Sequence, residues 1–236
     1  MISLSIIFSF RNEEDNIKEL IKRVYNSLKN FNGLNWELIF INDSSTDRSS
    51  QIINQEARKL KIKTSIFTTS RRFGVTPCVL FGISKAKTDY IVYLDSDLQD
   101  PPELIPSMLK KALENKLDVI HTIRSKRLGE NHLKMLITRM AYILINKLSD
   151  IDLKNNAGDF KLLSRRAYES VLLNRDKDPY MRGLVASVGF NMDYLTYERE
   201  ERFAGEKKFS LFSSLNPYRE LIRAITLHSD IPLFFA

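Results

Sequence analysis

Three acidic residues follow a short apolar segment in the stretch LDSDLQDPPEL, residues 94–104. Asp95 and Asp97 are separated by one residue, Asp100 comes next, and two prolines then prevent the chain from continuing as a strand. Neighbouring carboxylates are costly unless a cation neutralises them. Magnesium and manganese prefer oxygen ligands and commonly bind one or two carboxylates together with substrate phosphates. The acids could therefore form a metal site, although an acidic loop in which Asp100 caps the next helix is the simpler explanation of the motif alone.

Basic side chains that could bind phosphates lie in two other stretches. The sequence RFAGEKKFS contains Arg202, Lys207 and Lys208, and the sequence IRSKR contains Arg124 and Arg127. Arginine and lysine commonly take up the negative charge that a metal-bound diphosphate retains. Taken alone, each stretch is equally well described as a solvent-facing basic loop.

Several other kinds of site have no motif in this sequence. There is no GxxxxGK[ST] phosphate loop, no GxGxxG dinucleotide turn and no nucleophile elbow. His121, His132 and His228 lack the spacing of metal ligands, and Cys78 lies in a helical pattern that predicts packing. The basic stretches have no interleaved aromatic residues, which argues against binding of single-stranded nucleic acid.

The elements that would position these residues alternate along the first half of the chain. Apolar β-branched segments predict strands, and apolar residues at helical spacing predict the helices between them. The predicted strands are residues 2–8, 36–43, 62–69, 89–95 and 117–123. The predicted helices are residues 11–31, 44–60, 74–86 and 101–116. This alternation predicts an α/β fold, with a mostly parallel, Rossmann-like sheet and helices on both faces.

Polar clusters follow four of the predicted strands. They are Ser9–Glu13, Asn42–Ser45, Arg71–Gly74 and Asp95–Asp100. Ligands of parallel sheets bind outside the carboxyl ends of the strands, so we expect these clusters to meet at one edge. That position makes a metal site as good an explanation of the acids as a helix cap.

The second half of the chain is less regular and is expected to continue the same domain. Its predicted elements are a helix at 131–151, a strand and a helix begun by Ser164 within 155–172, a helix at 180–189 and a strand at 192–200. We expect residues 1–208 to form the catalytic domain. We expect residues 209–236 to form an amphipathic helical segment, which suits either a membrane surface or packing on the domain.

Composition narrows the class of protein. The chain has 236 residues, of which 43% are hydrophobic and 28% charged, as expected for a globular domain. It has no run of eighteen apolar residues, and its first apolar segment indicates a strand rather than a signal peptide. A single cysteine suits a reducing compartment. The net charge of +7 lies mostly in the second half, which could face phosphates, an anionic membrane or nucleic acid.

Seven stretches, in order along the chain, resemble one protein family. They are SFRNEEDNI, FINDSSTDRS, SRRFG, DSDLQDPPELI, AGDFKLLSRRA, YMRGLVASVGF and RFAGEKKFSL. Together they resemble the polyprenyl-phosphate glycosyltransferases, family 2 enzymes of the GT-A fold that are related to dolichol-phosphate mannosyltransferase and bactoprenol glucosyltransferases. The resemblance covers nearly the whole chain, and the stretch around Asp95 and Asp97 matches almost without change.

The resemblance implies a role for each matching position. Asp97 would ligate Mg²⁺ or Mn²⁺ directly, with Asp95 and Gln99 beside it. Arg124 and Arg127 would contact an acceptor phosphate. The implied donor-binding residues are Ser9, Phe10, Arg11, Glu13, Asn42, Asp43, Arg72, Asp95, Ser96, Arg202 and Lys208. The implied catalytic residues are Asp95, Asp159, Arg202 and Lys208.

The implied reaction moves a sugar from a nucleotide sugar, preferably a UDP-sugar, to a polyprenyl phosphate, with inversion of configuration. It would take place in the cytoplasm at the inner face of the cell membrane, with peripheral membrane contact and without nucleic acid. A phosphate acceptor is already anionic and needs no base. The alternative acceptor is a hydroxyl of a lipid-linked surface glycan, and Asp159 would then have to remove its proton.

Some positions depart from the family pattern. Ser9, Arg11, Asn42 and Ser44 replace common residues of the nucleotide pocket, so the base of the donor is left open. Ser187 stands where tryptophan is common, which leaves the sugar and acceptor open. A homo-oligomer, and a binding module without catalytic activity, are also left open.

Overall fold

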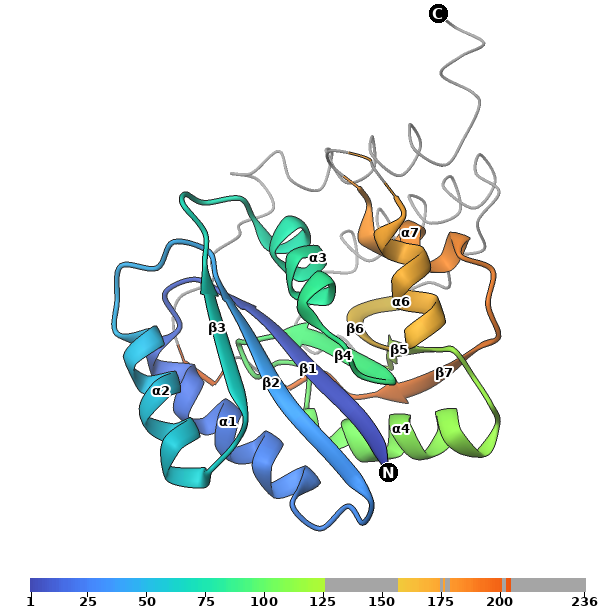
Figure 1. The fold of residues 1–236 in the computed structure, drawn as a ribbon, viewed down its shortest axis with the longest axis horizontal. Helices are drawn as coiled ribbons and strands as arrows, with labels where there is room; N and C mark the ends of the chain where they lie inside the picture. The colour runs from blue at the N-terminus through green and yellow to red at the C-terminus, as the bar shows by residue number, and fades with distance from the viewer. Residues whose placement is uncertain (126–156, 175, 177–178, 201–202, 205–236) are drawn as a thin grey trace, which may run out of the picture.

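Seven strands form one sheet, and helices cover both of its faces (Figure 1). The computed structural model describes residues 1–125, 157–174, 176, 179–200 and 203–204. The strands are β1 (Ile2–Phe10), β2 (Leu34–Asn42), β3 (Thr64–Thr68), β4 (Tyr90–Asp95), β5 (Val119–Arg124), β6 (Ala157–Ser164) and β7 (Met192–Tyr197). The helices are α1 (Glu14–Leu28), α2 (Ser49–Leu60), α3 (Val75–Lys85), the short 3₁₀ helix η1 (Pro102–Leu104), α4 (Ile105–Glu114), α6 (Arg165–Leu172) and α7 (Met181–Ser187).

The strands lie in the order β3-β2-β1-β4-β6-β5-β7. Neighbours are parallel except at β6, which runs antiparallel to both β4 and β5. The predicted α/β fold and mostly parallel sheet are therefore confirmed. The alternation pattern did not reveal that β6, from the second half of the chain, separates β4 from β5.

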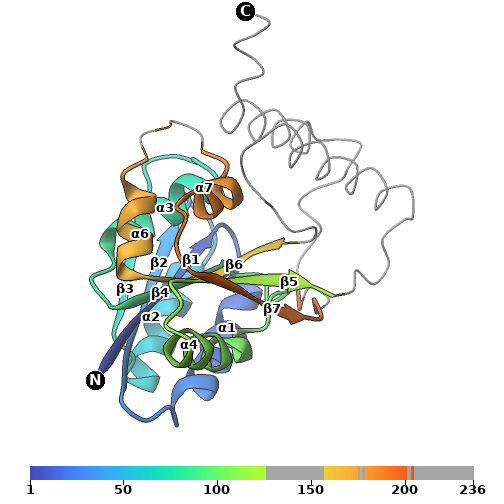
Figure 2. The same ribbon diagram turned by 90° about the vertical axis from the view of Figure 1, so that its right-hand side faces the viewer.

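Two hydrophobic layers hold the helices against the sheet (Figure 2). On one face, α1, α2 and α4 pack on β1 side chains such as Leu4, Ile6 and Phe8. On the other face, α3, α6 and α7 pack on residues such as Ile7 and Ile91. Because both faces are covered, the strands are apolar almost throughout, as parallel sheets usually are.

Helix α3 approaches the sheet unusually closely. A Cβ atom added to Gly82 would lie 2.5 Å from Cγ2 of Ile7 and 3.2 Å from Cγ1 of Ile41. A larger residue would push the helix off β1 and β2, so glycine is required at this contact. The predicted packing of Cys78 in the same helix is confirmed, since its side chain is buried.

Several sequence expectations fall on residues that the structure does not describe. They are the helix at 131–151 and the segment 209–236, and the division of the chain after residue 208 therefore stays a prediction. Among the described residues, no helix has the length and apolar character needed to cross a membrane.

Candidate active site at the carboxyl edge of the sheet

The carboxyl ends of β1, β2 and β4 lie side by side. Strand pairing places Asp95 opposite Ser9 and places Asn42 opposite Phe10. The polar clusters after the first, second and fourth predicted strands therefore meet at one edge of the sheet, as the alternation predicted.

The acid motif forms a tight turn directly after β4. Oγ of Ser96 donates to the backbone oxygen of Ser9 at 3.2 Å, which ties the turn to β1. The backbone N–H of Gln99 donates to Oδ1 of Asp97 at 3.2 Å. Leu98 has a φ of 61° and a fully buried side chain, so an apolar anchor holds the turn in a left-handed conformation. The acids are thus positioned by the fold and do not lie in a solvated loop.

The turn concentrates negative charge. Burial, followed by the charges of Asp100, Asp97 and Asp159, raises the pKa of Asp95 to about 7. Arg124 acts in the opposite direction but does not cancel the effect. A divalent cation would offset this excess charge, and carboxylate oxygens are the ligands that magnesium and manganese prefer. The residues present therefore fit such an ion.

Protein side chains alone do not complete a metal site here. Among the described residues, no group of three or more His, Cys, Asp or Glu side chains is arranged to hold an ion. An ion held by two carboxylates takes its remaining ligands from substrate phosphates and water. The arrangement fits a cation that binds together with a phosphorylated substrate.

The prediction that Asp100 caps the following helix is wrong. Neither η1 nor α4 has a side-chain cap, and Asp100 is fully buried. Its carboxylate instead accepts a hydrogen bond from the hydroxyl of Tyr197, lies 3.5 Å from Nη2 of Arg124 and lies 3.9 Å from Nε of Arg199. Arg124 lies in β5, Tyr197 ends β7 and Arg199 follows it, and nothing in the residues next to Asp100 indicates these partners.

Arg124 is an interior residue of this cluster. Its side chain is mostly buried, and its Nε donates to the hydroxyl of Tyr197 at 3.1 Å. The carboxylate of Asp100 raises the pKa of Arg124 against the opposing effect of burial. The two atoms nearest a Cβ added to Gly158 would be Oγ1 of Thr122 at 2.9 Å and the Tyr197 hydroxyl at 3.4 Å, so only glycine fits beside the cluster. Contact of Arg124 with an acceptor stays a prediction.

The predicted nucleotide-binding residues hold the loops at the ends of β1 and β2. Both carboxylate oxygens of Asp43 accept backbone hydrogen bonds, from Phe73 at 2.7 Å and from Gly74 at 3.0 Å. Nη1 of Arg11 donates to the backbone oxygens of Asp43 and Ser44. Asp43 therefore links the β2 loop to the start of α3.

Glu13 and Asn42 have similar local roles. Glu13 is buried at the start of α1, and its Oε2 accepts from Nδ2 of Asn16 at 2.6 Å. Oδ1 of Asn42 accepts from the backbone N–H of Ser45 at 2.7 Å. The two side chains are fixed before any ligand binds, which is the pre-organisation that a binding site needs. Their contacts with a nucleotide stay predictions, as does that of Arg72, whose side chain is exposed.

Asp159 is paired with an arginine that the sequence analysis did not single out. Nε and Nη2 of Arg182, at the start of α7, donate to the two oxygens of Asp159 at 2.8 and 2.6 Å. This bidentate pair lowers the pKa of Asp159 although burial acts in the opposite direction. Asp159 is thus held as a carboxylate.

Lys161 is a second residue that sequence reasoning missed. Its side chain is fully buried in β6, and Nζ donates to the backbone oxygen of Gly158 at 2.5 Å. Burial lowers its pKa to about 8, while the charge of Asp159 acts to raise it. A lysine within the otherwise apolar run FKLL was the available signal, since a strand buried on both faces rarely accepts a charge without a nearby counter-charge.

The chain on either side of Arg202 is fastened beside the acid turn. The backbone N–H of Glu200 donates to the carbonyl of Gln99 at 3.0 Å, and Nδ2 of Asn16 donates to the carbonyl of Ala204 at 3.3 Å. The remaining predicted basic residues lie outside the described residues; they are Arg127, Arg202, Lys207 and Lys208.

Known proteins resemble this chain over nearly its full length. The family model described as glycosyl transferase family 2 matches residues 5–172. YkcC of Bacillus subtilis, an uncharacterized glycosyltransferase, is 36% identical over 235 residues, which are 100% of this chain and 71% of the relative. A prophage bactoprenol glucosyl transferase homolog of Escherichia coli is 34% identical over 234 residues, which are 98% of this chain and 74% of the relative.

Solved structures share the fold at lower identity. TarS 1–349 of S. aureus, in complex with UDP-GlcNAc, superposes with a TM-score of 0.63 at 17% identity, covering 96% of this chain and 66% of that chain. Glucosyl-3-phosphoglycerate synthase of Mycobacterium tuberculosis, in complex with Mn²⁺, UDP-glucose and phosphoglyceric acid, has a TM-score of 0.62 at 16% identity, covering 95% and 77%. This chain thus spans slightly less than two thirds of the TarS chain.

These similarities confirm the GT-A fold and the expectation of an enzyme. Divalent metal ions and UDP-sugars are found in structural neighbours of this fold. The match of the family model covers more than half of the chain, and two relatives exceed 30% identity over nearly all of it. The chain is therefore a glycosyltransferase and belongs to glycosyl transferase family 2.

Proposed function

We propose that this enzyme transfers a sugar from a nucleotide sugar to a polyprenyl phosphate, with inversion of configuration. The bactoprenol glucosyl transferase homolog among its relatives supports a lipid phosphate as acceptor, and the UDP-sugars bound by structural neighbours favour a uridine donor. The observation that carries the proposal is the excess negative charge of Asp95 and Asp97 at the edge where the β1 and β2 loops also end.

Asp97 and Asp95, with Gln99 beside them, would hold Mg²⁺ or Mn²⁺ against the diphosphate of the donor. When bound, the ion supplies positive charge that stabilises the nucleoside diphosphate as it leaves. Ser96 and Leu98 keep the two carboxylates at the end of β4 through the tight turn. No rearrangement of the backbone is then needed when donor and ion arrive.

The loops of β1 and β2 would bind the nucleoside. Glu13 and Asp43 would hold the ribose and the base, with Ser9, Phe10, Arg11, Asn42 and Arg72 around them. Their existing bonds to neighbouring backbone and side-chain groups keep this rim in place. Arg202 and Lys208 would clamp the diphosphate, and the bonds of Glu200 and Ala204 fix the chain on either side of Arg202 near the acid turn.

A phosphate acceptor would attack the anomeric carbon from the side opposite the leaving diphosphate. It is already ionised near neutral pH, so no protein base has to act. Arg124 and Arg127 would neutralise its charge, and Asp159 would shape the acceptor side through Arg182. A membrane acceptor also implies work in the cytoplasm at the inner membrane face, with residues 209–236 lying on the lipid surface.

Calorimetric titration with a panel of UDP- and GDP-sugars, with and without Mn²⁺, tests this proposal. We expect one nucleotide class to bind in the presence of Mn²⁺ and much more weakly in its absence. Asp97→Asn should abolish the metal-dependent part of binding, while the matched exposed change Asp15→Asn should leave it intact. Binding that is equally tight without a divalent ion would contradict the metal role.

A transfer assay with each acceptor completes the test. Polyprenyl phosphate should accept the sugar, and a lipid-linked glycan with a free hydroxyl should not. The opposite preference would favour the second acceptor chemistry and assign Asp159 a direct role as base.

A further inference from the structure

One continuous stretch of the chain carries only positive charge. Residues 57–88 contain eight basic residues and no acidic residue, so the rest of the chain, taken together, is close to neutral. All eight side chains are exposed. They are Arg58, Lys59, Lys61, Lys63, Arg71, Arg72, Lys85 and Lys87.

The fold places this stretch at one border of the molecule. It covers the end of α2 on one face of the sheet, the edge strand β3, and the whole of α3 on the other face (Figure 1). Within the described part of the chain, only Lys63 of the eight forms an ion pair, with Glu37 at 2.6 Å. Arg71 and Lys85 instead lie over aromatic rings, 4.6 Å from the ring centre of Phe73 and 4.8 Å from that of Phe81. The border therefore presents a strong, mostly unneutralised positive field.

Apolar side chains are exposed in the same stretch. Phe73, Val75 and Phe81 are 46%, 53% and 39% exposed. They are three of the six large apolar residues that are exposed in the described part of the chain. Exposed aromatic and aliphatic groups among basic residues are the combination found on surfaces that lie in the headgroup region of a bilayer.

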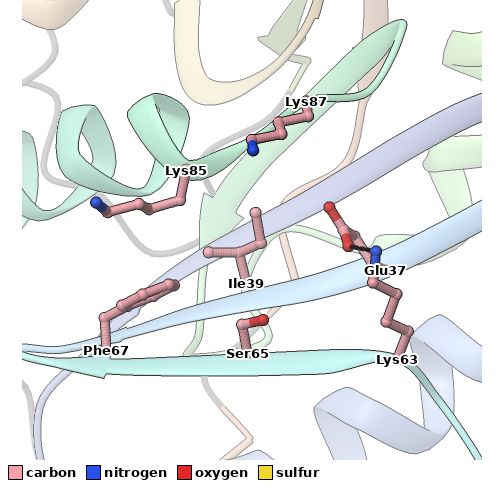
Figure 3. Close-up of a pocket in the computed structure, with 7 residues that line it drawn as sticks. All are labelled: Glu37, Ile39, Lys63, Ser65, Phe67, Lys85 and Lys87. Carbon is pink, nitrogen blue, oxygen red and sulfur yellow. Dashed lines mark ion pairs between the residues drawn. The ribbon is translucent and has the colours of Figure 1, made fainter.

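A hollow lies between the end of α3 and strands β2 and β3 (Figure 3). Its volume is about 170 Å³, and its floor is formed by Ile39, Ser65 and Phe67. Lys85 and Lys87 stand on one side of it, and Lys63, bonded to Glu37, stands on the other. The hollow thus offers an apolar floor with amino groups around its rim.

We propose that this basic border, residues 57–88, is a docking surface for an anionic phospholipid bilayer. Its lysines, with Arg58 and Arg71, contact lipid phosphates, and Phe73, Val75 and Phe81 enter the headgroup region, while Arg72 belongs to the donor site. The positive charge of the border matches the anionic cytoplasmic leaflet, and its exposed apolar side chains match the apolar side of the headgroup region. A nucleic acid would not require these exposed apolar side chains. The proposal rests on the proposed function in one respect, because a polyprenyl phosphate acceptor lies in the same bilayer. The proposed surface consists of residues 57–88 and does not include residues 209–236.

Sedimentation with vesicles tests the surface without any substrate. The full chain is mixed with vesicles of phosphatidylcholine, or of equal parts of phosphatidylcholine and phosphatidylglycerol, at low and high salt. We expect binding to the anionic vesicles only, weakened by salt. The double change Lys85→Glu and Lys87→Glu should reduce it roughly thirtyfold, since two basic contacts are lost. The control, Lys18→Glu with Lys116→Glu, makes the same charge change on exposed lysines of α1 and the end of α4 and should have a much smaller effect.

A fluorescence measurement tests the apolar part. Trp36 is the single tryptophan, so Phe81→Trp in a Trp36→Phe background places one reporter on the proposed surface. Brominated phosphatidylglycerol vesicles should quench it, and they should not quench a reporter placed by Asn26→Trp on the exposed side of α1. Equal quenching at both positions would overturn the proposal.

Three other outcomes would also overturn it. They are equal vesicle binding by the two double variants, a change of oligomeric state in the Lys85 and Lys87 variant without loss of vesicle binding, and binding of short RNA through these lysines without binding of vesicles.

A measurement of enzyme activity separates this proposal from the proposed function. The Lys85 and Lys87 variant should retain full transfer to polyprenyl phosphate in detergent and lose it with acceptor in anionic vesicles. Absence of transfer by the parent enzyme in detergent would refute the proposed function and leave the vesicle result standing.

Discussion

Asp159 is the residue whose role differs most between the two acceptor chemistries. Its carboxylate receives two hydrogen bonds from Arg182, and this pairing lowers its pKa. A carboxylate held so firmly in its ionised form is a poor proton acceptor, because general bases work best with a pKa near the working pH. The geometry therefore favours a role in which Asp159 holds Arg182 in position over one in which it removes a proton.

We expect Asp159→Asn to reduce the transfer rate to polyprenyl phosphate by less than about tenfold, since no proton has to be removed from a phosphate. A general base would cost about 10²–10⁴-fold on the same change. Steady-state rates measured from pH 6 to pH 9 check this, because loss of a base would also alter the pH profile. A loss above a hundredfold with this acceptor would contradict the positioning role.

The residues of the site differ in how far the sequence could identify them. Asp95 and Asp97 follow an apolar strand, and that local pattern was enough to predict their position. Lys161 lies two residues from Asp159 in the same strand and had a local signal, whereas Arg182 approaches Asp159 only after β6 and α7 have packed. The interior partners of a charge depend on tertiary contacts, and a local pattern does not contain them.

At the scale of elements, the cluster around Asp100 joins the acid turn to β5 and β7. Asp100 is fully buried, and its partners Arg124 and Tyr197 lie 24 and 97 residues further along the chain. Removal of one partner of a buried ion pair leaves the other charge uncompensated. The cluster therefore fixes the position of the turn against two strands at once.

We expect Asp100→Asn to lower the free energy of unfolding by about 3 kcal/mol, because Arg124 would keep a mostly buried charge without its carboxylate partner. Urea unfolding followed by circular dichroism measures the change. Adding Arg124→Met should restore part of the loss, since the two changes are coupled. A loss below about 1 kcal/mol, equal to that of the exposed change Asp176→Asn, would show that the cluster does not hold the turn.

The start of α6 depends on one hydroxyl group. Oγ of Ser164 accepts from the backbone N–H of Ala167 and donates to Oδ1 of Asp118 at 2.7 Å. Ser164→Ala should therefore cost about 1 kcal/mol in the free energy of unfolding. Ser170→Ala in the same helix is the matched control, because its hydroxyl bonds only the carbonyl of Arg166 within the helix. Equal stability of the two variants would contradict the capping role.

At the scale of the whole molecule, the succession of strands and helices was predictable, but the order of the strands was not. Local periodicity located the elements because each helix buries one apolar face and each inner strand buries two. The place of β6 between β4 and β5 depends on which edges pair, and the composition of a strand does not specify its neighbours. This pairing of β6 determines the composition of the site, because β6 is the strand that brings Asp159 and Lys161 to the acid turn.

The stability of the whole fold should also depend on a buried histidine. His121 lies in β5, is 3% exposed and stacks on the ring of Tyr194 with 5.3 Å between ring centres. Burial, assisted by the charge of Lys161, lowers its pKa to about 3. The unfolded chain has the ordinary value near 6.5. Below that pH the unfolded state binds a proton that the folded state refuses, so the free energy of unfolding falls as the pH falls.

This dependence amounts to about 1.4 kcal/mol for each pH unit between 6.5 and 3 and vanishes above 6.5, where the histidine is neutral in both states. His121→Phe keeps an aromatic ring beside Tyr194 and removes the titrating group. We expect the difference in unfolding free energy between this variant and the parent to be constant from pH 7.5 to pH 9. From pH 6.5 to pH 5 it should shift steadily in favour of the variant.

Urea unfolding at each pH measures both ranges, and the upper range is an internal control because any packing change would appear there as well. A difference that stays constant down to pH 5 would mean that His121 is protonated within the fold, with Nε2 bonded to a group that the described residues do not supply.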